Sequence, residues 1–132
     1  MANQLYPLAK TALLTNSPTI DLDNTEIRAS LVTAGYTYSA THQYITSVSS
    51  THRVATVALT SKTVVNGVFD AADATFTNVS GSEVTQIIIW QWSGSEASSP
   101  LLAIIDTASG LPKVPNGGNI IVSWNAAGIF AL

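Results

Sequence analysis

The sequence contains no cysteine and few charged residues. Among its 132 residues, 10% are charged, against about a quarter in an average soluble domain. The absence of cysteine excludes disulfide bonds and thiolate metal ligands. The five basic residues are scattered along the chain: Lys10, Arg28, Arg53, Lys62 and Lys113. They form no basic stripe that would neutralise phosphates, so direct nucleic-acid binding is not expected.

Long apolar runs are also lacking. Those present, such as residues 87–90, are far too short to cross a bilayer. Residues 1–4 lack the basic region and apolar stretch with which a secretory signal begins. We therefore expect a soluble protein made in the cytoplasm, with no membrane partner.

Apolar residues are nevertheless plentiful, at 46% of the chain. A chain of this length is expected to form one domain, residues 1–132, with a sizeable core. Its polar surface must come largely from its 31 serines and threonines. A surface so poor in charge gives weak repulsion between copies, which favours self-association or burial in an assembly. A sticky monomer would have the same composition.

One short helix is predicted near the N-terminus. The spacing of an amphipathic helix is found in five apolar residues: Leu5, Leu8, Ala9, Ala12 and Leu13. Pro7 is tolerated only in the first turn, and residues 16–18 end the helix. The expected segment, about residues 4–15, is too short to be stable alone. It must therefore pack on the domain or on a partner.

From residue 26 onward the apolar pattern changes to the period of two that is typical of strands. About eight short strands are expected, drawn from residues 27–31, 54–60, 63–65, 68–69, 74–79, 84–92, 101–105, 120–124 and 129–132. Asn66 and Gly67 predict a two-residue hairpin turn. Residues 84–92 are apolar on both faces, which indicates a central strand. We predict a mainly β fold, an antiparallel sandwich or barrel with one N-terminal helix.

The stretch at residues 36–50 is less regular. Tyr44, Ile45 and Val48 have the spacing of a helical turn, which Thr41 would cap.

The residues that carry chemistry form no recognisable catalytic or metal-binding pattern. Residues 21–26 hold Asp21, Asp23 and Glu26, which favour a structural turn; a hard cation such as calcium is the alternative. Asp70 and Asp73 are expected to cap backbone N–H groups, with acid–base catalysis the minor alternative. His42 and His52 fall on different elements, and the nucleophile elbow Gly-x-Ser-x-Gly is missing. We expect no enzyme, no metal and no cofactor.

Three tryptophans are candidates for the core or for binding. Trp90 and Trp124 fit the interior of a sandwich. Trp92 shares a strand face with Trp90 but lies closer to the strand end, before Ser93 and Gly94. It is therefore the first choice for an exposed anchor, to a partner protein or to a sugar.

Nearly the whole chain resembles a family of small virion proteins of tailed bacteriophages and prophages. The similarity is carried by LYPLAK at residues 5–10, IRASLV at 27–32, YTYSATHQY at 36–44, NGVFDAAD at 66–73, SPLLAIID at 99–106, GLP at 110–112, and PNGGNI at 115–120 with Trp124. These are turn and packing motifs of moderate specificity. Residues 90–92 depart from the pattern, because relatives are more polar there. The resemblance implies a structural component of the particle.

Three functions are therefore weighed. The first is a capsid decoration (cement) protein that bridges capsomers, binds the major capsid protein and forms a homo-oligomer, with a trimer as the form such proteins often take. The second is a tail, baseplate or fibre component, and the third is a carbohydrate-binding module. The expected location is the virion. The candidate interface residues are Leu5, Leu8, Leu13, Trp92, Phe130 and Leu132.

Overall fold

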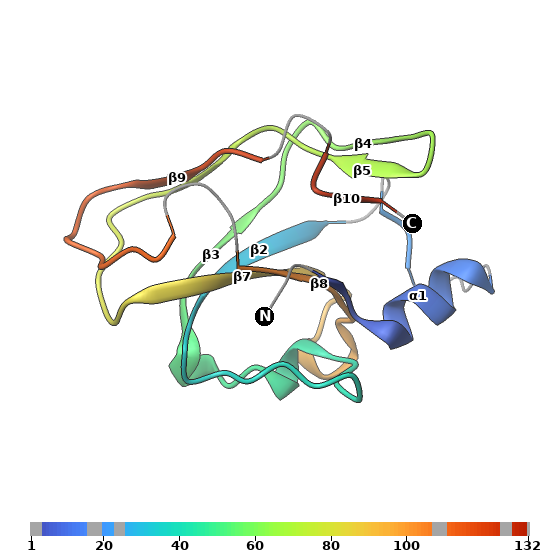
Figure 1. Ribbon diagram of the computed structural model, residues 1–132, viewed down its shortest axis with the longest axis horizontal. Helices are drawn as coiled ribbons and strands as arrows, with labels where there is room; N and C mark the ends of the chain where they lie inside the picture. Colours follow the sequence, from blue (N-terminus) through green and yellow to red (C-terminus); the bar gives the residue numbers. More distant parts are fainter. Residues whose placement is uncertain (1–3, 16–19, 23–25, 107–110, 125–127, 132) are drawn as a thin grey trace.

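The structure is a computed structural model that describes residues 4–15, 20–22, 26–106, 111–124 and 128–131 (Figure 1). These residues form ten strands in antiparallel pairs and one α-helix, which confirms the mainly β prediction. The described strands do not close into a barrel and are consistent with a sandwich. The elements are β1 (Gln4–Leu5), α1 (Pro7–Leu14), β2 (Ile27–Thr33), η1 (Ile45–Ser47), η2 (Ser50–His52), β3 (Arg53–Ala58), β4 (Thr63–Val65), β5 (Val68–Asp70), β6 (Ala74–Phe76), β7 (Val84–Gln91), η3 (Glu96–Ser98), β8 (Leu101–Ile105), β9 (Ile120–Val122) and β10 (Phe130–Ala131), where η marks a 3₁₀ turn.

A five-stranded sheet with the order β1-β8-β7-β2-β3 forms the middle of the molecule. Figure 1 shows two smaller sheets, β6-β9 and β10-β5-β4, above it, and the irregular segment 34–52 below it. Because both faces are covered, every residue of β8 and all but one of β7 are buried. This explains why these strands are apolar without alternation. The prediction that residues 84–92 hold a central strand is confirmed.

The buried face of the sheet also contains polar side chains, and these are paired. The indole N–H of Trp90 donates to Ser30 Oγ at 2.9 Å, and Ser30 Oγ lies 2.7 Å from Thr56 Oγ1. Gln86 donates from Nε2 to the carbonyl oxygens of Thr33 and Tyr36, at 2.8 and 2.9 Å. A buried polar group without a partner costs about 1–3 kcal/mol. The bonds among Trp90, Ser30 and Thr56 tie β7, β2 and β3 together, and the bond from Gln86 to Tyr36 fixes the irregular segment to the sheet.

The hairpin predicted at Asn66 and Gly67 is confirmed. Both residues have positive φ, 53° and 78°, as a tight two-residue turn between β4 and β5 requires. On its other side β5 pairs with β10. Gly128 precedes β10 with φ of 111°, and a Cβ built on it would lie 2.3 Å from Val68 Cγ1. The return of the chain to β5 thus depends on a residue without a side chain.

The sequence prediction differs from the structure at both ends of the expected helix and in the irregular segment. The helix begins at Pro7, because Gln4 and Leu5 pair with β8 as the edge strand β1. It ends at Leu14, and residues 16–18 lie outside the described part of the chain. The helical turn near residue 45 exists as η1, but the predicted Thr41 cap is wrong. Tyr44 precedes η1, and no side chain caps it.

Replacing Gly128 by alanine should destabilise the fold more than the same change at Gly94. Gly94 has a similar φ, 98°, but a Cβ there would meet nothing within 4 Å. Both variants carry the backbone strain of positive φ, and only Gly128→Ala adds overpacking, worth about 1–3 kcal/mol. Urea unfolding measures the free energy of unfolding of each variant. Equal losses would contradict the close packing of Gly128 on β5.

Candidate interaction surface

The helix α1 is held to the rest of the molecule by few of its own residues. Ala9 is the only one of its eight residues that is buried. Its N-cap residue, Tyr6, makes no side-chain cap bond, and the helix has no acidic residue in its first turn and no basic residue in its last. A helix of eight residues is not stable alone in water. Its stability must come from packing, which this chain supplies only in part.

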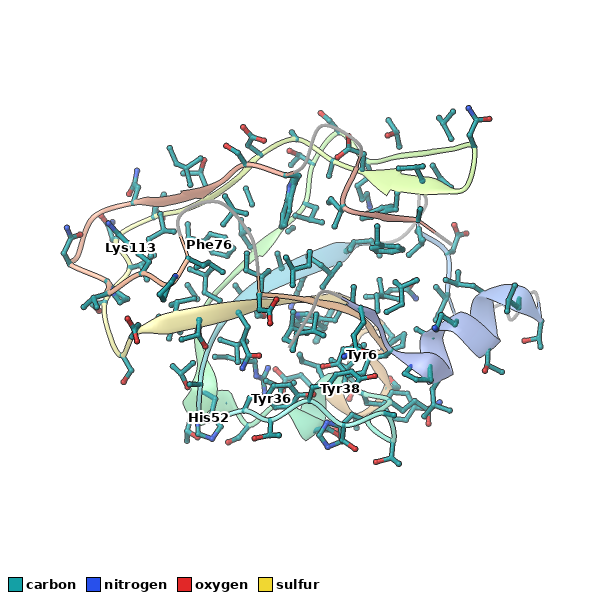
Figure 2. All side chains as sticks on the ribbon, viewed as in Figure 1. Tyr6, Tyr36, Tyr38, His52, Phe76 and Lys113 are labelled. Carbon is teal, nitrogen blue, oxygen red and sulfur yellow. The ribbon has the colours of Figure 1, made fainter. Side chains whose placement is uncertain are left out.

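Tyr6 fixes the beginning of this helix. Its side chain is fully buried, and its backbone N–H donates to Leu102 O at 3.0 Å. The hydroxyl lies 2.7 Å from that of Tyr36, which in turn lies 2.8 Å from His42 Nδ1. Figure 2 shows Tyr6, Tyr36 and Tyr38 grouped beneath the sheet; the rings of Tyr6 and Tyr38 are 5.1 Å apart.

Burial raises the pKa of both Tyr6 and Tyr36 above the ordinary tyrosine value. Both phenols therefore remain protonated at neutral pH, so neither can act as a phenolate base there. The hydrogen-bonded row is a structural tie between α1, the sheet and the irregular segment.

An open groove of about 150 Å³ lies on one side of α1. Its walls come from the helix and from the chain near η1, η3 and the start of β8: Leu8, Ala9, Ala12, Ile20, Gln43, Tyr44, Ser98, Pro100 and Leu101. Leu8, a candidate interface residue, is 39% exposed. The groove is lined by mixed polar and apolar groups.

A second depression of about 120 Å³ lies between the end of α1 and the small sheet. It is lined by Leu13, Leu22, Val64, Gly67, Phe69 and Phe130, none of which carries a charge. The rings of Phe69 and Phe130 pack 5.2 Å apart at its floor. Two candidate interface residues from opposite ends of the chain, Leu13 and Phe130, are thus brought to one hollow.

Large apolar side chains stand exposed beside this depression. Val64, which lines it, is 46% exposed on β4, and Leu14, which follows Leu13 at the end of α1, is 73% exposed. Figure 1 shows α1, the β4–β5 hairpin and β10 at the same end of the molecule. We name this surface, formed by Leu13, Leu22, Val64 and Phe130, the α1 patch. Exposed apolar clusters of this kind mark binding surfaces.

Sequence reasoning did not single out Leu14, Val64 and Val65. The two consecutive valines before the hairpin turn were the signal for an exposed apolar residue. Consecutive side chains of a strand point to opposite faces, so a sheet that is covered on one face cannot bury both. Leu14 lies one position beyond the predicted apolar stripe of the helix. A leucine outside that stripe was the signal that it would be exposed.

The other candidate interface residues have different positions. Leu5 is half-buried against the core on β1. Leu132 lies outside the described residues. Trp92 is half-buried and follows β7, so it is less open than the exposed anchor predicted from the sequence.

Trp92 is also covered by a charged neighbour. The guanidinium of Arg28 lies over its ring at 4.2 Å from the centroid, and 5.4 Å from that of Trp90. Arg28 is further paired with Glu26. Cation–π contacts of this geometry are favourable by about 0.5–1 kcal/mol at exposed sites. One face of the Trp92 ring is therefore occupied within the chain itself.

Trp90 is buried as expected, and Trp124 is half-buried, with its N–H donating to Ala72 O at 3.0 Å.

The carboxylates and histidines are engaged in local structure. Asp70 Oδ1 accepts from the backbone N–H of Ala71 at 2.8 Å, which confirms the capping predicted for that residue, whereas Asp73 Oδ2 accepts from Ser123 Oγ at 3.3 Å. His52 Nδ1 lies 3.4 Å from Thr33 Oγ1, and His42 Nδ1 lies 2.8 Å from the Tyr36 hydroxyl. Within the described residues, no three His, Asp or Glu side chains gather as metal ligands would. The segment at residues 23–25, part of the acidic turn, lies outside that description.

An ion pair holds η3, which forms one wall of the groove. Arg53 donates from both terminal nitrogens to Glu96, at 2.9 and 3.1 Å. The Arg53 side chain is largely buried, whereas Glu96 is open to solvent. The hydrogen bonds from Arg53 lower the pKa of Glu96 below its ordinary value.

A scan of the sequence against protein-family models and a search of curated proteins each found no match. Within the described chain, no helix has the length and apolar character needed to cross a membrane.

The Arg53–Glu96 pair should make the folded state lose stability in acid. A carboxyl whose pKa is lowered by folding contributes stability above its unfolded value of 4.5. That contribution is lost as the pH falls through the lower, folded pKa. Unfolding free energies of the wild type and Glu96→Gln should therefore differ near neutral pH and converge in acid. Glu83→Gln, at an exposed position, is the control. A pH-independent difference for Glu96→Gln would contradict the pairing.

Proposed function

We propose that this chain is a structural component of a tailed-phage virion, and specifically a capsid decoration protein that binds the major capsid protein. The observation that supports this most is the α1 patch, an uncharged apolar surface on an otherwise closely packed β domain. The resemblance of the sequence to small virion proteins supports the same role. The proposed activity is binding, without catalysis.

The physical requirements of a decoration protein are met by several features of the described chain. A sheet buried on both faces resists deformation, since cores are packed as densely as organic crystals. The surface carries little charge, so neighbouring copies repel one another weakly. A copy that binds the assembled shell better than separated subunits stabilises the shell by mass action.

A tail, baseplate or fibre role would use the same kind of surface, and the copy number separates the two. On the order of hundreds of copies per particle indicate the shell, whereas about three to a few dozen indicate the tail. The carbohydrate-binding role is less favoured, because Arg28 covers one face of the Trp92 ring on which a sugar would stack.

Changing Val64 to aspartate should reduce incorporation into particles by about tenfold or more, since a loss of about 1.4 kcal/mol in binding is tenfold. The charge would be placed at a residue that lines the depression of the α1 patch and is 46% exposed, so folding should be unaffected. Ile121→Asp is the matched control. Ile121 is 60% exposed on β9, which Figure 1 shows at the opposite end of the upper layer.

Quantitative mass spectrometry of purified particles measures incorporation of each variant against the wild type. Equal incorporation of Val64→Asp and Ile121→Asp would argue against the α1 patch as the contact surface.

Particles that lack the protein should release their DNA at a lower temperature than complete particles. The bound copies stabilise the closed shell, and their removal takes that free energy away. A dye that fluoresces on DNA reports the release during a temperature ramp. Adding purified protein back should restore the wild-type temperature, and Val64→Asp should fail to do so. Identical release temperatures with and without the protein would reject the cementing role.

A further inference from the structure

Asparagine followed by glycine occurs twice in the chain, at residues 66–67 and 116–117. In such a pair the asparagine side chain loses its amide readily, because the glycine has no side chain to hinder attack by its backbone nitrogen on the asparagine Cγ. Both asparagines and both glycines are exposed, so water reaches each pair. A difference in reactivity between the two pairs in the folded protein must therefore come from their hydrogen bonds.

The pair at Asn116 is held closed by such bonds. The N–H of Gly117, whose nitrogen would have to make the attack, donates to Val79 O at 2.7 Å. Asn116 Oδ1 accepts from the N–H of Gly118 at 3.0 Å, so the side-chain amide is held as well. Val79 N–H donates in return to Gly118 O at 2.9 Å, which ties this loop to the segment after β6. Attacking group and target are both engaged.

The pair at Asn66 has no such restraint. Within the described part of the chain, no oxygen accepts from the N–H of Gly67, and the Asn66 side chain forms no hydrogen bond. The strand β4 before it has three exposed residues and is the outer strand of its sheet, so among the described strands only β5 holds it. Short exposed segments of this kind open locally at little cost in free energy. Opening lets the backbone of Asn66 rotate until Gly67 N reaches Cγ.

We propose that Asn66 is a site of spontaneous modification, at which water converts the asparagine to an aspartate or an isoaspartate through a cyclic imide. Gly67 N bonds to Asn66 Cγ, the Cγ–Nδ2 bond breaks, and the amide nitrogen leaves as ammonia with the proton that Gly67 loses. Water then adds to one of the two imide carbonyl carbons and cleaves its bond to Gly67 N. Cleavage at Cγ leaves an aspartate, whereas cleavage at the backbone carbon leaves an isoaspartate, whose main chain is longer by a methylene group.

Either product changes the surface beside it. Gly67 lines the depression of the α1 patch, where none of the lining residues carries a charge. An aspartate places a negative charge at its rim, and an isoaspartate also lengthens a turn that joins β4 to β5 with two residues. Modified copies should therefore bind the capsid protein less well, a consequence that rests on the proposed function. The chemical step itself does not depend on that function.

Peptide mass spectrometry of the purified protein, incubated at mildly alkaline pH, measures this step. Trypsin cuts after Lys62 and Lys113, so the two pairs fall on separate peptides. In the folded protein Asn66 should lose its amide about tenfold faster than Asn116 or more, because each hydrogen bond is worth a factor of about five and two must break at Asn116. In urea, where both pairs are free, their rates should become similar.

Three outcomes would overturn the inference. The first is a similar rate at the two pairs in the folded protein, and the second is an Asn66 that keeps its amide while the protein stays folded. The third is a preference for Asn66 that persists unchanged in urea, because the difference would then come from the neighbouring sequence and not from the hydrogen bonds of the fold.

The substitution Asn66→Asp separates this site from the virion role. It supplies the charge without the longer main chain, since aspartate followed by glycine also suits this turn, and Asn116→Asp is its matched control. If Asn66 loses its amide but both variants enter particles equally, the modification site stands and the α1 patch is rejected as the contact surface. If Asn66 keeps its amide while Asn66→Asp alone lowers incorporation, the site is rejected and the proposed function stands.

Discussion

The burial of β7 and β8 on both faces is the constraint on which the rest of this structure depends. A sheet covered on one side only would leave half of its isoleucines in water, so the chain must supply two covering layers. The small sheets provide one and the irregular segment 34–52 provides the other. A segment without regular structure has backbone groups that need partners. Gln86 meets part of that need by donating to the carbonyl oxygen of Tyr36.

This arrangement explains why the apolar surface collects at one end. The strands in the middle use both of their faces for the core and leave nothing apolar to solvent. The helix α1 is added beyond that core, after an edge strand of two residues, and only Ala9 is buried. Its remaining leucines, together with the hairpin valines, have no layer of this chain to cover them. The α1 patch is therefore a consequence of where the sheet ends.

Local signals in the sequence predicted much of this fold. Asn66 and Gly67 specify a turn by their own conformational preference, and the two-sided apolar run at residues 84–92 marks a strand with neighbours on both sides. The strand β1 has no such signal, because a strand of two residues is too short to show an alternating apolar pattern. Its residues pair with β8 only because the fold places them beside that strand. Thr41 was predicted to cap the turn at η1, yet that 3₁₀ turn forms without a side-chain cap.

The interaction surface could be predicted only in part, for a related reason. Leu13 and Phe130 were predicted as separate apolar residues, and only the pairing of β5 with β10 brings Phe130 to the end of α1. Exposure of Leu14 and Val64 is a property of the folded whole. A periodic pattern in the sequence indicates which apolar residues share a face of a helix or strand. An exposed apolar surface consists of the apolar residues that no other part of the folded chain covers.

The groups that could perform chemistry are largely engaged in holding the described chain together. The phenols of Tyr6 and Tyr36 and the ring of His42 form one tie, Arg53 and Glu96 form another, and Arg28 is shared between Glu26 and the tryptophans. A catalytic group must keep a lone pair or a proton available to a substrate. Side chains that already satisfy one another inside the fold are poorly placed for that. The contact role that we propose for this end of the molecule rests instead on its apolar area and shape.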